Sequence, residues 1–291
     1  MPLGMGVLSV VENLTHRALA ARGVQSRWVD TSVARLHAYD APGRGPLGTV
    51  AVLHGISSSA AAYGSLIQRL RGRFNRVVAP DAPGHGRSGD PRVDLNPETL
   101  FTSMSELLDR ELTEPSVVFG CSLGGAVAVS YALARPDRVR ALVLASPAGA
   151  AMDAEELERF LAVFRMQSRS DAVDFLGRLH RRAPWYTPFI ASDLMNLFAR
   201  PVISTFTASV RPAHLFTPEQ LASLSMPVHL LWGRADRLLP GSSLEFYRKH
   251  LPSHAVIEEP DRWGHCPHFD DPAALAEKIA EFTRRAERSA R

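Results

Sequence analysis

The sequence predicts the α/β class, with a mostly parallel sheet that is covered by helices on both faces. Its 291 residues suffice for one large domain, and 45% apolar with 22% charged residues is the usual composition of a globular protein. Short and nearly continuous apolar runs are typical of strands that are buried on both faces. These runs alternate with segments of helical periodicity, as in chains that build a parallel sheet.

The first predicted element is an N-terminal amphipathic helix over residues 1–24. Apolar residues recur there at helical spacing: Val7, Val10, Val11, Leu14 and Ala18. We expect this face to pack against the rest of the protein. Charged residues interrupt the apolar run and a basic start is missing, which argues against a secretion signal. Weak contact with a membrane surface is the alternative that the pattern leaves open.

A core domain is expected over residues 25–148 and 217–291. Residues 26–41 partly alternate between apolar and polar side chains, which predicts an antiparallel hairpin at the edge of the sheet. The buried parallel strands are predicted at residues 48–55, 76–80, 116–120, 140–146, 227–233 and 255–260. Helices are predicted between and after them, at residues 61–72, 97–112, 122–134, 242–251 and from 272 onward.

Residues 149–216 show a helical pattern without a clear strand, from "DAEELERFLAVFRMQ" to "ASDLMNLFARPV". An all-helical insertion between two strands most simply covers the carboxyl edge of the sheet, where ligands bind. We therefore expect a helical cap subdomain. Its aromatic and methionine cluster is a tentative substrate-binding set: Trp185, Tyr186, Phe189, Met195 and Phe198.

The uncharged stretch 115–134 has two possible interpretations. Twenty residues suffice for a membrane-spanning helix, and Gly120 and Gly124 have the GxxxG spacing of helix dimers. The same glycines flank Ser122 in the pattern G-x-S-x-G, a strand-to-helix turn that exposes a nucleophilic serine. Because the stretch lies within regular strand–helix alternation, we predict the turn and no integral membrane span.

A serine hydroxyl is a poor nucleophile at neutral pH and needs a base, which in turn needs an orienting acid. Ser122 is the candidate nucleophile. Asp236 follows the strand predicted at 227–233, and His265 follows about 30 residues later, roughly one βαβ unit. Adjacent strand ends should therefore bring the two side chains together. His268 competes for the role of base, but Gly264 gives the loop freedom to turn His265 inward.

An oxyanion hole is expected from two backbone N–H groups, those of Ile56 and Leu123. Gly55 lets the chain turn tightly before Ile56, and Leu123 directly follows the candidate nucleophile. We interpret His54 as a packing and hydrogen-bonding residue. The glycine-rich stretch from Asp81 to Gly89 is interpreted as a structural loop that borders the site.

Charge and cysteine content exclude several classes of function. The net charge is +3, the arginines are scattered, and no nucleic-acid motif is present, so we expect no nucleic-acid partner. Cys121 and Cys266 are too few for a disulfide framework, which predicts a reducing, cytoplasmic environment. Both cysteines are interpreted as small apolar filler.

Taken together, these motifs resemble the α/β-hydrolase superfamily. The resemblance rests on His54-Gly55, the loop from Asp81 to Ser88, and G-x-S-x-G-G ending at Gly125. It also rests on W-G-x-x-D-x-x-x-P from Trp232 and G-H-x-P ending at Pro267. It implies an α/β-hydrolase fold of the serine-nucleophile, esterase- or lipase-like branch, with an acyl-serine formed at Ser122. It also implies that no metal and no organic cofactor is required.

Three functions remain open at this point. The first is hydrolysis of a carboxylic ester, thioester or lactone of a medium-sized apolar small molecule. The second is hydrolysis of a carbon–carbon bond of the meta-cleavage type on the same three residues. The third is a ligand receptor on a hydrolase scaffold. The sequence does not decide the oligomeric state.

Overall fold

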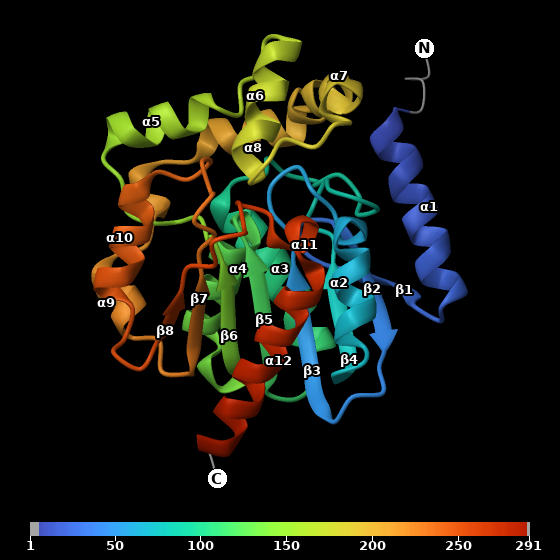
Figure 1. The fold of residues 1–291 in the computed structure, drawn as a ribbon, viewed down its shortest axis with the longest axis vertical. Helices are drawn as coiled ribbons and strands as arrows, with labels where there is room; N and C mark the ends of the chain where they lie inside the picture. The colour runs from blue at the N-terminus through green and yellow to red at the C-terminus, as the bar shows by residue number, and fades with distance from the viewer. Residues whose placement is uncertain (1–5, 290–291) are drawn as a thin grey trace.

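The computed structural model describes residues 6–289, which form an eight-stranded sheet flanked by helices (Figure 1). The strand order is β1-β2-β4-β3-β5-β6-β7-β8. The strands are β1 (Gln25–Asp30), β2 (Arg35–Pro42), β3 (Leu47–Leu53), β4 (Phe74–Pro80), β5 (Ser116–Cys121), β6 (Val139–Ala145), β7 (Val228–Leu231) and β8 (Val256–Glu258). β1 and β2 form the antiparallel edge hairpin that the alternation predicted, β2 pairs antiparallel with β4, and the remaining pairs are parallel.

Helices cover both faces of this sheet because its central strands are apolar on both sides. In β3, Val50 and Val52 contribute to one buried cluster, whereas Ala51 and Leu53 contribute to the other, as the two-residue period of a strand requires. One cluster includes side chains of α2 (Gly64–Leu70) and α12 (Pro272–Ser289). The other includes side chains of α3 (Pro97–Glu111), α4 (Leu123–Ala134), α9 (Pro218–Ala222) and α10 (Gly241–His250). The predicted α/β class with a mostly parallel sheet is thereby confirmed.

Four longer helices lie between β6 and β7 and extend over the carboxyl edge of the sheet (Figure 1). They are α5 (Ala154–Ala162), α6 (Arg169–Leu179), α7 (Thr187–Phe198) and α8 (Pro201–Ser209). We call residues 149–216 the inserted segment. It has a buried cluster of its own, in which the ring of Phe198 contacts Phe164 and Phe175 at centroid distances of 5.7 and 5.2 Å. The helical pattern at 191–202 is divided between two helices because Pro201 takes the first turn of α8, where its missing N–H costs nothing.

The N-terminal helix α1 (Val7–Ala21) stands beside the domain, but its packed face differs from the predicted one. Thr15 and Leu19 face Gly64 of α2, and Leu19 is buried. Val7, Val10, Val11 and Leu14 are instead 40–57% exposed. The prediction that these residues pack on the domain is therefore wrong, because Thr15 and Leu19 on a neighbouring side of the helix make the contact with α2. Residues 1–5 of the predicted helix lie outside the described residues.

The uncharged stretch 115–134 forms β5, a turn at Ser122 and α4, so the predicted strand-turn-helix arrangement is confirmed. β5 is buried along its whole length between β3 and β6. Over residues 6–289, none of the helices combines the length and apolar character that crossing a bilayer requires.

Candidate active site

Ser122 occupies the sharp turn between β5 and α4, with φ +55° and ψ −121°. A non-glycine residue rarely adopts this conformation, and such strain is typical of functional turns. The neighbouring glycines make the turn possible by allowing close backbone contact. A Cβ on Gly120 would lie 2.2 Å from the Gly124 carbonyl oxygen, and a Cβ on Gly124 would lie 2.3 Å from the Leu53 carbonyl oxygen. Strand and helix can therefore approach each other closely only if both residues are glycine.

Asp236 and His265 meet at the carboxyl edge of the sheet, beyond β7 and β8. His265 Nδ1 lies 2.8 Å from Asp236 Oδ2, and both side chains are almost completely buried. Asp236 Oδ1 accepts hydrogen bonds from the N–H groups of Leu238 and Leu239, at 2.9 and 3.3 Å. The carboxylate is thus held from both sides, and its second oxygen is directed to the imidazole.

The pKa of Asp236 lies below its ordinary value. Burial alone would raise this pKa, but the charge interaction and hydrogen bond with His265 and the Leu238 amide more than compensate. Asp236 is therefore ionised at neutral pH and accepts the hydrogen bond from Nδ1–H of His265. That leaves Nε2 of His265 as the basic atom of the ring.

His265 Nε2 is buried and has no hydrogen-bond partner among residues 6–289. Within the same range, the structure contains no hydrogen bond between Ser122 Oγ and His265. Of the three predicted residues, the structure therefore joins Asp236 and His265 by a direct hydrogen bond. Ser122 Oγ is carried on one rotatable bond, and in unliganded enzymes such contacts are often loose.

His268, the competing histidine, is placed elsewhere. Its ring stacks on Tyr63 with centroids 3.8 Å apart and planes at 15°. Burial lowers the pKa of His268 well below its ordinary value, so the ring is neutral and part of the packed interior. It is His265, rather than His268, that contacts Asp236.

The two predicted oxyanion donors border Ser122. Gly55 approaches so closely that a Cβ there would lie 3.2 Å from Ser122 Cβ, which places the Ile56 loop beside the serine. Leu123 is the first residue of α4, where backbone N–H groups have no partner within the helix. Both Ile56 and Leu123 line the same pocket as Ser122.

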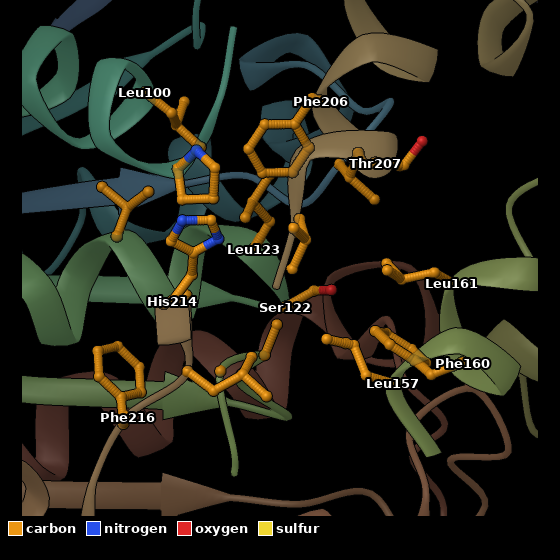
Figure 2. Close-up of a pocket in the computed structure, with 18 of the residues that line it drawn as sticks. Leu100, Ser122, Leu123, Leu157, Phe160, Leu161, Phe206, Thr207, His214 and Phe216 are labelled. Atoms are coloured by element: carbon orange, nitrogen blue, oxygen red, sulfur yellow. The ribbon is translucent and has the colours of Figure 1, made fainter. Parts of the chain in front are cut away.

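The pocket at Ser122 lies between the sheet edge and the inserted segment and has about 920 Å³ of empty space, including its open mouth. Figure 2 shows the Ser122 hydroxyl pointing toward Leu157, Phe160 and Leu161 of α5. The remaining walls include Phe101, Met152, Phe164, Phe206, Val210, Leu215 and Phe216. Apart from Ser122, the side chains with polar atoms in the lining are those of Ser130, Thr207 and His214. Such a site suits an apolar ligand group.

The tentative substrate-binding set is not part of this lining: Trp185, Tyr186, Phe189, Met195 and Phe198. Trp185 is 82% and Phe189 is 66% exposed, and Phe198 is buried among other rings of the inserted segment. This prediction is therefore corrected. α5 supplies the pocket wall instead. The spacing of the apolar residues in the sequence of this segment could have indicated that wall. Leu157, Phe160, Leu161 and Phe164 follow the i, i+3, i+4, i+7 pattern of one helix face.

Comparison with known proteins gives the family. The sequence profile of the alpha/beta hydrolase family matches residues 50–278, well over half of the chain. The chain belongs to the alpha/beta hydrolase family.

Two relatives and one solved structure illustrate the range of similar proteins. An uncharacterized protein, Rv2715, of Mycobacterium tuberculosis is 28% identical over 84% of this chain and 77% of its own. A pimeloyl-[acyl-carrier protein] methyl ester esterase of Methylococcus capsulatus is 31% identical over 82% of this chain and 95% of its own. The 2-hydroxy-6-oxo-6-phenylhexa-2,4-dienoate hydrolase of a Rhodococcus strain matches with a TM-score of 0.77 and 24% identity, covering 90% of this chain and 99% of its own. This α/β hydrolase thus has relatives named as esterases.

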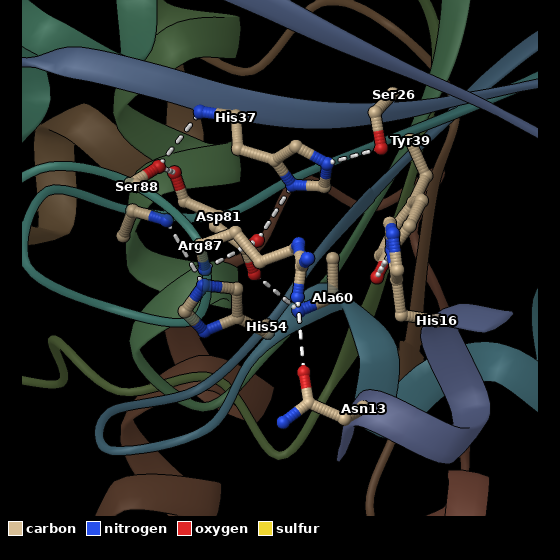
Figure 3. Close-up of polar contacts among 11 residues, drawn as sticks. Asn13, His16, Ser26, His37, Tyr39, His54, Ala60, Asp81, Arg87 and Ser88 are labelled. Carbon is tan, nitrogen blue, oxygen red and sulfur yellow. Dashed lines mark hydrogen bonds and ion pairs between the residues drawn. The ribbon is translucent and has the colours of Figure 1, made fainter. Parts of the chain in front are cut away.

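A buried polar network supports the Ile56 loop of this α/β hydrolase (Figure 3). Asp81 Oδ1 accepts from the N–H of Ala60 at 2.7 Å, and Oδ2 accepts from His37 Nδ1 at 2.8 Å and from the N–H of Arg87 at 3.1 Å. Burial would raise the pKa of Asp81, but the hydrogen bond from His37 and the nearby His54 lower it. Asp81 therefore links two loops as an ionised structural group, as expected for this stretch.

His54 also holds the loop together. Its Nδ1 lies 2.7 Å from the Gly55 carbonyl oxygen, and its Nε2 accepts from the N–H of Ala82 at 3.0 Å. Because both ring nitrogens are engaged with backbone atoms, neither is available to a substrate. Burial lowers the pKa of His54, so the ring is neutral.

The two cysteines of the α/β hydrolase are unsuited to nucleophilic chemistry. Burial raises the pKa of Cys121 to about 12, and its thiol lies 3.5 Å from the His265 carbonyl oxygen. Burial also raises the pKa of Cys266 well above its ordinary value. A thiol reacts as its thiolate, so both groups are inert at neutral pH.

Proposed function

We propose that this α/β hydrolase is a serine hydrolase that cleaves a carboxylic ester, thioester or lactone with a medium-sized apolar acyl group. One observation carries the proposal. The Asp236–His265 pair leaves Nε2 of the imidazole without a partner among the described residues, and it lies at the edge of the sheet that also carries Ser122. At this edge the strained Ser122 turn opens into an apolar pocket. The substrate is a small molecule, and every proposed step uses side chains and amides of this chain.

In the first step, Ser122 Oγ turns to His265 Nε2 and gives up its proton as it attacks the substrate carbonyl carbon. Asp236 keeps Nδ1–H oriented and stabilises the imidazolium that forms. The N–H groups of Ile56 and Leu123 bind the developing oxyanion. When the tetrahedral intermediate collapses, the leaving alcohol or thiol takes the proton from Nε2, and an acyl-serine remains.

In the second step, His265 Nε2 removes a proton from water, whose oxygen attacks the acyl-serine. The acid leaves, and Ser122 regains its proton. The inserted segment acts as a cap in this scheme, because α5 and α8 contribute side chains to the pocket that receives the acyl group. The apolar walls bind the acyl group through burial of its surface.

The pocket favours an ester over the product of an aromatic ring cleavage. The Rhodococcus hydrolase is named for a dienoate, which is an anion. A buried carboxylate requires a cation or several hydrogen-bond donors. The lining around Ser122 contains neither lysine nor arginine, and its polar side chains are Ser130, Thr207 and His214.

The proposal is tested with p-nitrophenyl esters of two to twelve acyl carbons. We expect Ser122→Ala and Asp236→Asn to lower kcat/KM by about 10³-fold or more. The exposed Ser253 provides the matched control, and Ser253→Ala should retain the rate of the unaltered protein. A fluorophosphonate reagent should label Ser122. Equal ester turnover by Ser122→Ala would refute the proposal, and saturable ligand binding without labelling or product would indicate the receptor alternative.

A further inference from the structure

The outward face of α1 is a stripe of exposed aliphatic side chains. Val7, Val10, Val11 and Leu14 are 48%, 40%, 53% and 57% exposed. They share one side of the helix by their spacing, whereas Thr15 and Leu19 on a neighbouring side contact α2. A helix that buries its less apolar side and exposes its more apolar side has an unpartnered face.

A second exposed apolar group lies at the beginning of α7. Trp185 is 82%, Phe189 is 66% and Tyr186 is 40% exposed. The Trp185 ring contacts those of Tyr186 and Phe189, with centroids 5.9 and 6.3 Å apart. Three neighbouring aromatic rings at the surface of a protein are costly in water unless another surface covers them.

The two groups belong to adjoining helices. The N–H of Leu8 in α1 donates a 2.9 Å hydrogen bond to Asp193 Oδ2 in α7. Asp193 lies one turn after Phe189 and therefore on the same side of α7. Figure 1 shows the beginning of α1 beside α7. We call the exposed residues of both groups the apolar rim: Val7, Val10, Val11, Leu14, Trp185, Tyr186 and Phe189.

Arginines accompany the apolar rim. Arg17 follows Leu14 by one turn, and Arg181 and Arg182 lie shortly before Trp185; all three are exposed. In the described part of the chain, none of them forms an ion pair. In a symmetric dimer through this face, the patch would meet a second copy of itself that carries the same unpaired arginines, so the rim residues would supply no acidic partner. An anionic lipid surface supplies the opposite charge instead.

We propose that the apolar rim and its arginines dock this protein onto a membrane containing anionic phospholipid. Val7, Val10, Val11 and Leu14 enter the boundary between headgroups and acyl chains, as the apolar face of an interfacial helix does. Trp185 and Tyr186 lie at the level of the headgroups, the usual place of amphipathic rings in membrane proteins. Arg17, Arg181 and Arg182 contact lipid phosphates.

The test measures co-sedimentation of the full chain with vesicles of phosphatidylcholine alone and with vesicles in which roughly a third of the lipid is phosphatidylglycerol, whose negative charge attracts basic side chains. We expect binding to the anionic vesicles. Two double variants should each bind the anionic vesicles more weakly by about tenfold or more. They are Val10→Ser with Leu14→Ser, and Trp185→Ser with Phe189→Ser. Arg181→Gln with Arg182→Gln should weaken this binding by about 30-fold at low salt.

Val93 provides the matched control, because it is 51% exposed and lies outside the apolar rim. Val93→Ser should bind like the unaltered chain. Hydrolysis of a short soluble ester should be unchanged in all these variants, which separates a failure of docking from a failure of the proposed function. The proposal is overturned if the unaltered chain stays in the supernatant, or if the rim variants bind as well as Val93→Ser. It is also overturned if light scattering shows a dimer that the rim variants convert to monomers without any vesicle binding.

Discussion

Gly264 lies against the end of α6 so closely that a Cβ on it would come within 2.5 Å of the Leu179 carbonyl oxygen. The same oxygen accepts a hydrogen bond of 2.8 Å from the N–H of His265. The Asp236 loop is held in a similar way, since the N–H of Arg237 donates to the Arg178 carbonyl oxygen at 3.2 Å. The inserted segment therefore contacts the backbone of both loops that form the Asp236–His265 pair.

Replacing Gly264 by alanine should separate these two backbones. The new methyl group meets a backbone carbonyl, which cannot move away as a flexible side chain could. We expect Gly264→Ala to lower kcat by about 10²-fold through misplacement of His265, with a smaller effect on KM. Overpacking should also lower the free energy of unfolding by about 1–3 kcal/mol. Steady-state ester kinetics and urea unfolding measure the two effects.

Gly177 in α6 is the matched control for this change. A Cβ on Gly177 would meet nothing within 4 Å. Gly177→Ala should keep kcat and raise the free energy of unfolding by about 0.5–1 kcal/mol, because alanine favours the helix. If both glycine variants had the same kcat, the contact between α6 and the His265 loop would be irrelevant to catalysis.

Phe160 should set the length of the acyl group that the pocket accepts. It projects from α5 into the pocket near Ser122 (Figure 2). Each buried methylene contributes about 0.8 kcal/mol, so the space opened by Phe160→Ala should raise the ratio of kcat/KM for dodecanoyl over butanoyl esters about tenfold. The assay uses p-nitrophenyl esters below their micellar concentrations.

Phe189→Ala tests the corrected view of the pocket. Because Phe189 is exposed and absent from the lining, its removal should leave the chain-length ratio unchanged. An altered ratio in Phe189→Ala, or an unaltered one in Phe160→Ala, would show that the acyl group binds elsewhere.

Acid should destabilise the protein through His85. Burial lowers the pKa of His85 from its ordinary value of 6.5 to about 3. As the pH falls from 6.5 toward 3, His85 binds a proton in the unfolded chain but not in the folded chain. The free energy of unfolding therefore decreases. This single group should account for about 2.5 kcal/mol of lost stability between pH 7 and pH 4.5.

The variant His85→Phe isolates this contribution, because it keeps a ring and removes the titrating group. Urea unfolding at pH 7 and at pH 4.5 gives the loss of stability for each protein. The loss should be smaller in the variant by about 2.5 kcal/mol. Equal losses in the two proteins would mean that His85 is not a neutral buried group in the folded state.

The sequence determined the strands, their mainly parallel pairing and the turn at Ser122. These features follow from local patterns: β-branched residues in β5, glycines at positions 120 and 124, and helical periodicity directly afterward. The pairing of Asp236 with His265 was also predictable, since successive parallel strands end at one edge of the sheet. The order of these strands along the chain already limits which of the loops that follow them can contact each other at that edge.

Only the tertiary structure decided which apolar faces are buried. In α1 the periodic valines were predicted to pack and instead face outward, and in the inserted segment Phe160 rather than Trp185 borders Ser122. Periodicity shows that a helix has an apolar side, but not which surface that side meets. The rotation of each helix depends on contacts with residues far away in the chain, such as Gly64 beneath Thr15 and Asp193 at the N–H of Leu8.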